Sequence, residues 1–175
     1  MITLRDMIES DIDDYVRWFT VDNEWMDFDA PWEDKGSSKE EELKSWSEYY
    51  QSIKDLPKEE TRWKLEIVYN NQHIGWVSYY FDLEYLDNPE RIPAIGIDIP
   101  EKSVYNKGLG TEALKQFIAY LKDKGYKNFF IQTWSGNKRM LRVAEKLGFE
   151  VFFIKKNHRL VNDTFYDAIT LIKRT

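Results

Sequence analysis

Four segments of the chain carry apolar residues at every third or fourth position, the spacing that places them on one face of a helix. The apolar positions run from Ile12 to Phe19, from Leu43 to Ile53, from Leu109 to Leu121 and from Met140 to Leu147. Ser38 with Glu41 forms a capping-box pattern before the second segment, and Gly125 and Gly148 are C-terminal stop signals after the third and fourth. We therefore predict four helices.

Seven further segments are rich in β-branched and aromatic residues, as strands are. They cover residues 2–5, 63–69, 74–81, 94–99, 129–134, 151–154 and 165–172. Asn70–His73 and Asn162-Asp163 are predicted to be the turns of two antiparallel hairpins. In the strand at 94–99, three isoleucines alternate with Gly96 and Asp98, so we expect Asp98 on the face opposite the isoleucines.

The order of these elements predicts an α/β (α+β) fold in which helices flank a mixed, twisted sheet. A length of 175 residues, of which 42% are hydrophobic and 32% charged, favours a single domain over residues 1–175. No segment reaches the roughly 20 apolar residues of a membrane span, and Met1–Phe19 lacks the apolar block of a signal peptide. We therefore expect a cytoplasmic protein without a membrane partner.

The charge and the absence of cysteine narrow the chemistry further. A net charge of −6 argues against nucleic acid as a partner, because binding a phosphate backbone requires clustered Lys and Arg. With no Cys and only His73 and His158, neither thiolate chemistry nor a metal site is expected. A small cationic amine suits this acidic chain better as a ligand.

A glycine-rich loop lies between the strand at 94–99 and the third helix. Its residues are Tyr105, Asn106, Lys107, Gly108, Leu109, Gly110 and Thr111. Glycines let a ligand approach the backbone closely, and the N–H groups of a helix N-terminus favour an anion. The loop therefore predicts a phosphate-binding site, although a Gly-x-Gly pair also occurs where a chain merely turns.

Two other phosphate-binding loops fit this segment less well. A dinucleotide-binding loop follows its strand directly and has an acidic residue about 20 positions on, whereas here Pro100–Lys107 intervene and the later residue is Asn128. A nucleoside-triphosphate loop places Lys-Ser or Lys-Thr after its last glycine, but Gly110 is followed by Thr111. A kinase or ATPase is excluded, and a dinucleotide enzyme is the weaker interpretation.

With its flanking segments, the loop resembles that of the GNAT N-acetyltransferase superfamily. Residues 106–113 are similar to the superfamily's pyrophosphate loop, residues 137–149 are similar to its next conserved block, and the element order is similar over essentially the whole chain. The resemblance implies the GNAT acyl-CoA N-acyltransferase fold, with acetyl-CoA as cosubstrate. It also implies direct transfer of the acetyl group to an amine, without an acyl-enzyme.

The resemblance also implies contacts for individual residues. The pyrophosphate would be held by Asn106, Lys107, Gly108, Leu109, Gly110 and Thr111. Asn137 would hydrogen-bond to the pantetheine arm, although it is equally a helix cap, and the backbone N–H of Ile99 would stabilise the oxyanion. Many relatives carry a hydroxyl at the position of Met140 or Ala144 that protonates the leaving thiolate. Both hydroxyls are absent, which leaves solvent or a tyrosine such as Tyr105 as the general acid.

Asp98 is the candidate catalytic residue. The run Gly96-Ile97-Asp98-Ile99 resembles the corresponding strand of aminoglycoside 6′-N-acetyltransferases, in which an aspartate contacts the substrate and assists proton removal. The alternative is a solvated or salt-bridged strand residue. Ribosomal-protein acetyltransferases, which the chain otherwise resembles, often carry Glu at the position of Ala94, and its absence disfavours a protein terminus as substrate.

The segment 22–34 combines six acidic residues with three aromatic ones. Carboxylates attract ammonium groups and aromatic faces bind cations, so we expect acceptor contacts from this segment. The candidates are Trp25, Asp27, Asp29 and Trp32. The alternative is a solvated acidic loop whose aromatic residues belong to the core.

These observations predict an acetyl-CoA-dependent N-acetyltransferase that acts on a primary amine. An aminoglycoside, with resistance to aminoglycosides as a corollary, or another small cationic amine is the expected acceptor. Two alternatives remain: a noncatalytic acyl-CoA-binding module, which the missing hydroxyls favour, and an acetyltransferase of a protein N-terminus. The sequence leaves both a monomer and a homodimer open.

Overall fold

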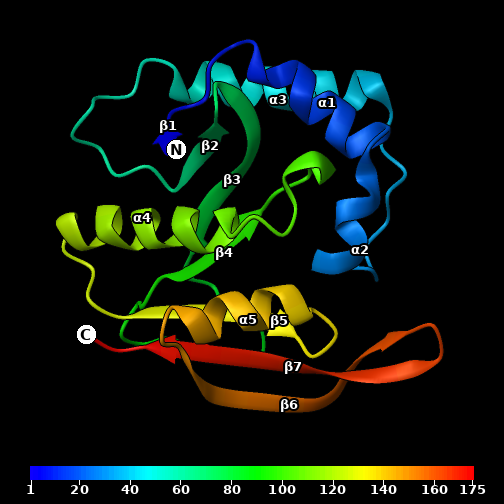
Figure 1. Ribbon diagram of the computed structural model, residues 1–175, viewed down its shortest axis with the longest axis vertical. Coiled ribbons are helices and arrows are strands. Elements are labelled where there is room, and N and C mark those ends of the chain that lie inside the picture. Colours follow the sequence, from blue (N-terminus) through cyan, green and yellow to red (C-terminus); the bar gives the residue numbers. More distant parts are fainter.

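The computed structural model describes all 175 residues and contains one seven-stranded sheet with strand order β1-β2-β3-β4-β5-β7-β6. Every neighbouring pair is antiparallel except β4 and β5, which are parallel. The strands are β1 (Ile2–Arg5), β2 (Lys64–Tyr69), β3 (Gln72–Tyr80), β4 (Ala94–Asp98), β5 (Phe129–Trp134), β6 (Glu150–Val161) and β7 (Thr164–Lys173). This arrangement confirms the mixed, twisted sheet flanked by helices (Figure 1).

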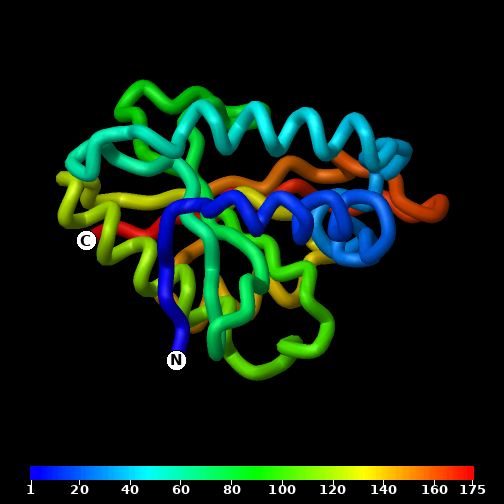
Figure 2. Tube along the Cα trace, turned by 90° about the horizontal axis from the view of Figure 1, so that it is seen from above, coloured from blue at the N-terminus to red at the C-terminus, as the bar shows by residue number.

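Helices cover both faces of the sheet. The α-helices are α1 (Asp11–Thr20), α2 (Met26–Asp29), α3 (Lys39–Ile53), α4 (Leu109–Asp123) and α5 (Lys138–Lys146), and short 3-10 turns occupy η1 (Asn23–Trp25) and η2 (Lys102–Val104). One core packs α4 and α5 against the sheet, and a second, aromatic core lies beneath α1 and α3 around Trp18 and Trp76. In Figure 2, α3 (cyan) and α4 (yellow-green) lie on opposite sides of the strands. None of the helices has the length and apolarity needed to cross a membrane.

The helices differ in how their N-termini are capped. Ser38 accepts a hydrogen bond from the N–H of Glu41 at 3.2 Å and donates its own N–H to that carboxylate at 2.9 Å, which confirms the capping box of α3. Helix α1 begins after Ser10, but the Ser10 side chain makes no capping bond. The carboxylate of Asp11, the first residue of the helix, instead accepts the N–H of Ile8 at 2.9 Å and so ties the preceding segment to the helix start.

The hairpins differ from the sequence prediction at their ends. The first turn contains only Asn70 and Asn71, both left-handed with φ of 48° and 64°, so Gln72 and His73 belong to β3. Strand β6 continues to Val161 through a polar stretch in which its pairing with β7 is interrupted between Lys155 and Arg159. There the N–H of Asn157 donates to the Asp167 carboxylate at 3.0 Å, which satisfies the backbone in place of a strand partner. Helix α2 was not predicted, since a single turn carries no period that a sequence can show.

The parallel strands β4 and β5 separate soon after they meet. Their register contains one pair, Ala94 with Phe130, and the N–H of Phe130 donates to the carbonyl of Pro93 at 2.9 Å. Beyond this pair the ends of the two strands diverge. The alternation along β4 is as predicted, because Ile95 and Ile97 pack into the α4 core while Asp98 lies on the opposite face.

Candidate active site

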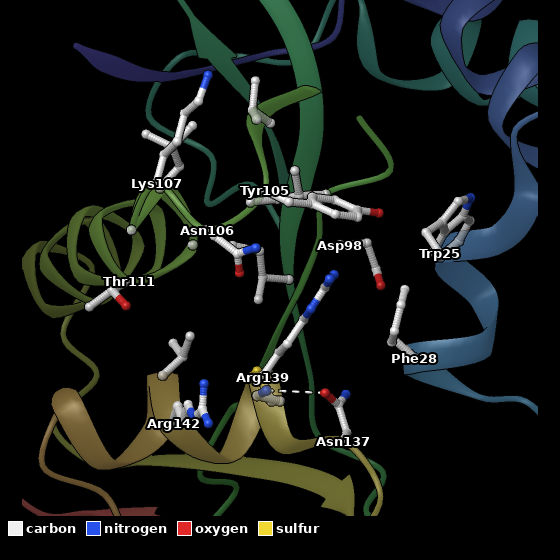
Figure 3. Close-up of a pocket in the computed structure, with 18 of the residues that line it drawn as sticks. Trp25, Phe28, Asp98, Tyr105, Asn106, Lys107, Thr111, Asn137, Arg139 and Arg142 are labelled. Atoms are coloured by element: carbon white, nitrogen blue, oxygen red, sulfur yellow. Dashed lines mark hydrogen bonds between the residues drawn. The ribbon is translucent and has the colours of Figure 1, made fainter. Parts of the chain in front are cut away.

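A cavity of about 330 Å³ lies where β4 and β5 diverge. Its walls come from the end of β4, the loop before α4, the first turn of α4, helix α5, and η1 with α2 (Figure 3). It is lined by Trp25, Phe28, Asp29, Ile97, Asp98, Ile99, Val104, Tyr105, Asn106, Lys107, Gly108, Leu109, Gly110, Thr111, Asn137, Arg139, Met140, Arg142, Val143 and Lys146. The cavity therefore brings together Asp98 and all the residues that the resemblance linked to a cofactor.

One end of the cavity is built for an anion. Gly108 precedes α4 in the left-handed conformation with φ of 75°, and no side chain caps the helix. The N–H groups of Leu109, Gly110 and Thr111 form the first turn, where a helix leaves its donors without intrahelical partners. Their partial positive charge lies at the cavity wall, which is the arrangement that holds a phosphate.

Three basic residues of α5 extend this positive end, and they were not predicted from the sequence. Arg139, Arg142 and Lys146 all line the cavity. Their separations of three and four positions place them on one side of a helix, so helical periodicity would have grouped them. With Lys107 they give the cavity four basic side chains in a protein whose net charge is −6.

Asn137 has a structural role as well as a place in the cavity wall. Its Oδ1 accepts the N–H of Met140 at 3.1 Å and caps α5. This bond is the helix-cap alternative that the sequence left open. Because the cap occupies Oδ1, the amide nitrogen of Asn137 is the group that remains for a ligand.

The other end of the cavity is acidic and aromatic. Asp98 shares this end of the cavity with Trp25 of η1 and Phe28 of α2 (Figure 3), and Asp29 of α2 also lines it. Burial raises the pKa of Asp98 well above its ordinary value, the Asp29 carboxylate raises it further, and the ammonium of Lys64 opposes both. Burial and the charge of Glu33 likewise raise the pKa of Asp29 to about 6.

Only two of the four residues expected to contact the acceptor line the cavity. Trp25 and Asp29 line the cavity, although Trp25 is only 7% exposed and its Nε1 donates to the carbonyl of Trp18 at 2.9 Å. Asp27 and Trp32 lie outside it. Asp27 faces solvent and pairs with Lys35 at 2.5 Å, since α2 turns it away from the cavity. Trp32 packs edge-to-face on Trp134, with ring centroids 5.7 Å apart.

Arg139 spans the cavity between its two ends. Its guanidinium carbon lies 4.2 Å from the ring centroid of Phe28 and 4.3 Å from that of Tyr105. The cation is therefore held between an aromatic ring of α2 and one of the glycine-rich loop. This contact couples the acceptor side to the loop and keeps Tyr105, the one tyrosine that lines the cavity, at its wall.

Met140 and Ala144, the two positions at which the sequence lacks an expected hydroxyl group, have different surroundings. Met140 lines the cavity, whereas Ala144 is fully buried in the α4 core. Tyr105 and Thr111 supply the hydroxyl groups of the lining. Burial raises the pKa of Tyr105, so its phenol is protonated at neutral pH and is chemically able to donate a proton.

The site is thus a cavity at the end of β4 with an anion-binding end and a carboxylate at the other end. Residues 1–150 match the family model described as an acetyltransferase (GNAT) domain. This match covers most of the chain, and it includes the glycine-rich loop and α5.

Solved structures share the fold over nearly the full chain. A ribosomal-protein-S5-alanine acetyltransferase from Vibrio fischeri has a TM-score of 0.76 at 21% identity, covering 99% of this chain and 92% of its own. A ribosomal L7/L12 α-N-protein acetyltransferase in complex with coenzyme A has a TM-score of 0.74 at 17% identity, covering 99% and 93%. A Salmonella typhimurium protein with its cofactor acetyl-CoA reaches 0.71 at 18% identity, again covering 99% and 93%. With the uncapped α4 loop and the divergence of β4 from β5, the family match establishes that this chain belongs to the GNAT acetyltransferase family.

Proposed function

We propose that this protein is an acetyl-CoA-dependent N-acetyltransferase that acetylates the primary amine of a small cationic molecule. The observation that carries the proposal is the single cavity that joins the uncapped start of α4 to the carboxylate of Asp98. A phosphate-binding end and a proton-accepting end in one cavity are what amine acetylation from a phosphate-bearing cosubstrate requires.

The residues at the anion end fit coenzyme A. The amides of Gly108–Thr111 would hold its pyrophosphate, and Arg142 and Lys146 supply further positive charge at this end. Gly108 is left-handed, and a Cβ atom added to it would meet no atom within 4 Å, so its backbone is open to a phosphate oxygen. When bound, acetyl-CoA supplies a thioester carbonyl. The N–H of Ile99, which follows β4, is the proposed donor to the oxyanion.

The residues at the acidic end fit an amine. An alkylamine has a pKa of about 10 and is protonated near neutrality, so it must lose a proton before it can attack. Asp98 is placed to accept that proton, and its raised pKa makes it a stronger base than an exposed carboxylate. Asp29 and Glu33 add negative charge on the same side, which favours a cationic acceptor over a neutral one.

A panel of amines tests this proposal through thiol release. The purified protein is incubated with acetyl-CoA and single acceptors: aminoglycosides, polyamines, amino acids and peptides with a free N-terminus. Release of free thiol with at least one cationic amine is expected, and the product should carry the acetyl group on nitrogen. Release only with peptides would replace the small-molecule acceptor with a protein terminus.

Ligand-dependent stability tests the cosubstrate separately. Acetyl-CoA should raise the melting temperature, because a ligand that binds only the folded state stabilises it, and NADH should not. Stabilisation by acetyl-CoA with no thiol release from any amine would favour a noncatalytic acyl-CoA-binding module. Equal stabilisation by NADH would contradict the cosubstrate assignment.

A further inference from the structure

One arginine of the cavity is held by aromatic rings instead of by a carboxylate. Arg139 extends from α5 into the middle of the cavity, between the glycine-rich loop and α2 (Figure 3). Its guanidinium carbon lies 4.2 Å from the ring centroid of Phe28 and 4.3 Å from that of Tyr105. All three residues line the cavity. The guanidinium therefore bridges two walls of the cavity through its contacts with the rings.

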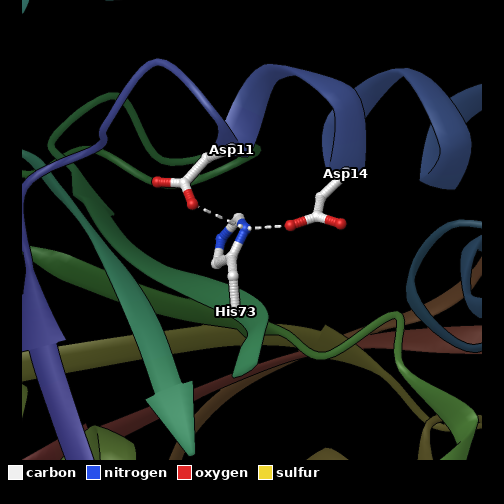
Figure 4. Close-up of side chains that lie close together, drawn as sticks. All are labelled: Asp11, Asp14 and His73. Atoms are coloured by element: carbon white, nitrogen blue, oxygen red, sulfur yellow. Dashed lines mark hydrogen bonds and ion pairs between the residues drawn. The ribbon is translucent and has the colours of Figure 1, made fainter. Parts of the chain in front are cut away.

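The buried cations beneath α1 are balanced in a different way. One ring nitrogen of His73 lies 3.0 Å from Asp14 and 3.3 Å from Asp11 (Figure 4), and the other lies 2.9 Å from Glu66. Lys64 Nζ lies 3.6 Å from Glu66 as well. Burial opposes the charge of His73, but its carboxylate partners raise its pKa to about 9. Carboxylates within the fold therefore neutralise these cations.

Arg139 has no such partner, since it belongs to none of the ion pairs of the chain. It is the second residue of α5, and the first turn of this helix contains no acidic residue. The partial positive charge at a helix N-terminus disfavours a cation there. Neither the stability of α5 nor internal charge balance accounts for an arginine at this position, whereas a negatively charged ligand in the cavity does.

The contacts of Arg139 close the passage between the two ends of the cavity. Tyr105 belongs to the loop that leads to the uncapped start of α4, and Phe28 belongs to α2 at the acidic end. Phe28 is anchored through its main chain, because Trp134 Nε1 donates to its carbonyl at 3.0 Å. The cavity volume of about 330 Å³ is near the lower limit of the roughly 300–1,000 Å³ found for small-molecule sites. The thioester arm of a cosubstrate held at α4 must cross this passage to reach Asp98, so Arg139 has to move.

We propose that Arg139 is a specificity-determining residue for the cosubstrate, which closes the passage to Asp98 in the free protein and is drawn out of it by a phosphate group. The proposal rests on the acetyl-CoA-dependent function proposed above. A phosphate offers the guanidinium two parallel, charge-assisted hydrogen bonds, whereas a ring face offers the weaker cation–π attraction. A thioester without phosphate groups gives Arg139 no stronger partner than the rings. The passage should therefore open for CoA and stay closed to pantetheine, which has the same arm without the phosphates.

The position of Arg139 can be measured by NMR without any acceptor. Protons above the face of an aromatic ring are shifted to high field by its ring current, so the Arg139 side chain should have high-field signals in the free protein. Arg139→Gln assigns these signals, because they disappear in that variant. Saturating CoA should return them to the ordinary arginine range, and pantetheine at the same concentration should not. High-field Arg139 signals in the CoA complex, or an equal change with pantetheine, would overturn the inference.

Titration calorimetry with CoA tests the competition between the rings and the ligand. Phe28→Leu removes one ring and keeps Arg139, so the passage opens more easily and CoA should bind about two- to fivefold more tightly, the factor that corresponds to one exposed cation–π contact. The variant also keeps the hydrogen bond from Trp134, which goes to the main chain. Phe165→Leu is the matched control, since Phe165 is exposed and lies outside the cavity, and its CoA affinity should equal that of the parent.

The effect of Phe28→Leu should depend on Arg139. In an Arg139→Gln background, Phe28→Leu should leave CoA affinity unchanged, because no cation remains for the ring to hold. Unchanged or weaker CoA binding in folded Phe28→Leu, with Arg139 present, would overturn the inference even if the protein acetylates amines. Absence of CoA binding to the parent protein would instead refute the proposed cosubstrate, and this inference with it.

Discussion

Gly75 lies against the backbone of Asp98 so closely that a Cβ atom at Gly75 would be 2.0 Å from the Asp98 carbonyl oxygen. It would also be 2.9 Å from the Cα of Ile99. No real Cβ contact is that short, and both atoms belong to the main chain, so a side chain here would move the end of β4. A glycine of β3 thus sets the position of the proposed base and of the proposed oxyanion donor.

Gly75→Ala should impair acetyl transfer more than cosubstrate binding. A displacement of about 1 Å can cost roughly 10²-fold in rate, and forced backbone shifts cost about 1–3 kcal/mol of stability. Steady-state rates, CoA affinity and denaturant unfolding measure the three effects. Gly96→Ala is the matched control, since its Cβ would meet only Ser78 Oγ at 3.8 Å. Equal rates for Gly75→Ala and Gly96→Ala would remove Gly75 from this role.

Asp98→Asn should reduce acetyl transfer by about 10²–10⁴-fold while CoA affinity stays the same, because general-base catalysis contributes that much. A pure positioning role would instead raise the acceptor's KM. The variant should also be more stable than the parent near neutral pH. The folded-state pKa of Asp98 is raised, so its ionisation opposes folding at every pH above the unfolded value of about 4. If folded Asp98→Asn has the same rate and the same acceptor dependence as the parent, Asp98 is a strand residue without a catalytic role.

Gly110→Val should weaken CoA binding by about tenfold or more, roughly 1.4 kcal/mol. A Cβ at Gly110 would make ordinary contacts, 3.7 Å from Ile97 and 3.8 Å from Ile99, so Gly110→Ala is the control that should fold well. The two methyl groups of valine extend further from a residue that lines the cavity, where the phosphate must approach the amides. Titration calorimetry compares the affinities. Parent-like CoA affinity in a folded Gly110→Val would contradict the loop assignment.

His73→Gln should lose stability in a pH-dependent manner. The folded-state pKa of His73 is about 9, above an unfolded value of about 6.5, so its contribution is fully present below pH 6.5 and is lost as the pH rises to 9. The difference between parent and variant should shrink by about 3 kcal/mol over that range. Lys64 has the opposite pH dependence, because its lowered pKa makes its burial less destabilising as the pH rises above 8. This contribution is present in both proteins, so it cancels in the difference between parent and variant. A difference that is constant with pH would show that the imidazole is neutral.

Local pattern alone determined most of the elements and one half of the site. The capping box at Ser38 and the turn at Asn162-Asp163 act within a few residues of chain, so the sequence contains all that is needed to predict them. The glycine-rich loop and the alternation that turns Asp98 away from the α4 core are equally local.

Tertiary structure decided which residues meet. The burial of His73 and Lys64, the opening between β4 and β5, and the approach of Gly75 to Asp98 follow from register between strands. Asp27 and Asp29 are two positions apart in one acidic segment, yet only Asp29 lines the cavity, because a single helical turn points them in different directions. Sequence period fixes the face on which a side chain lies, whereas its neighbour on that face comes from another strand or helix and depends on the packed fold.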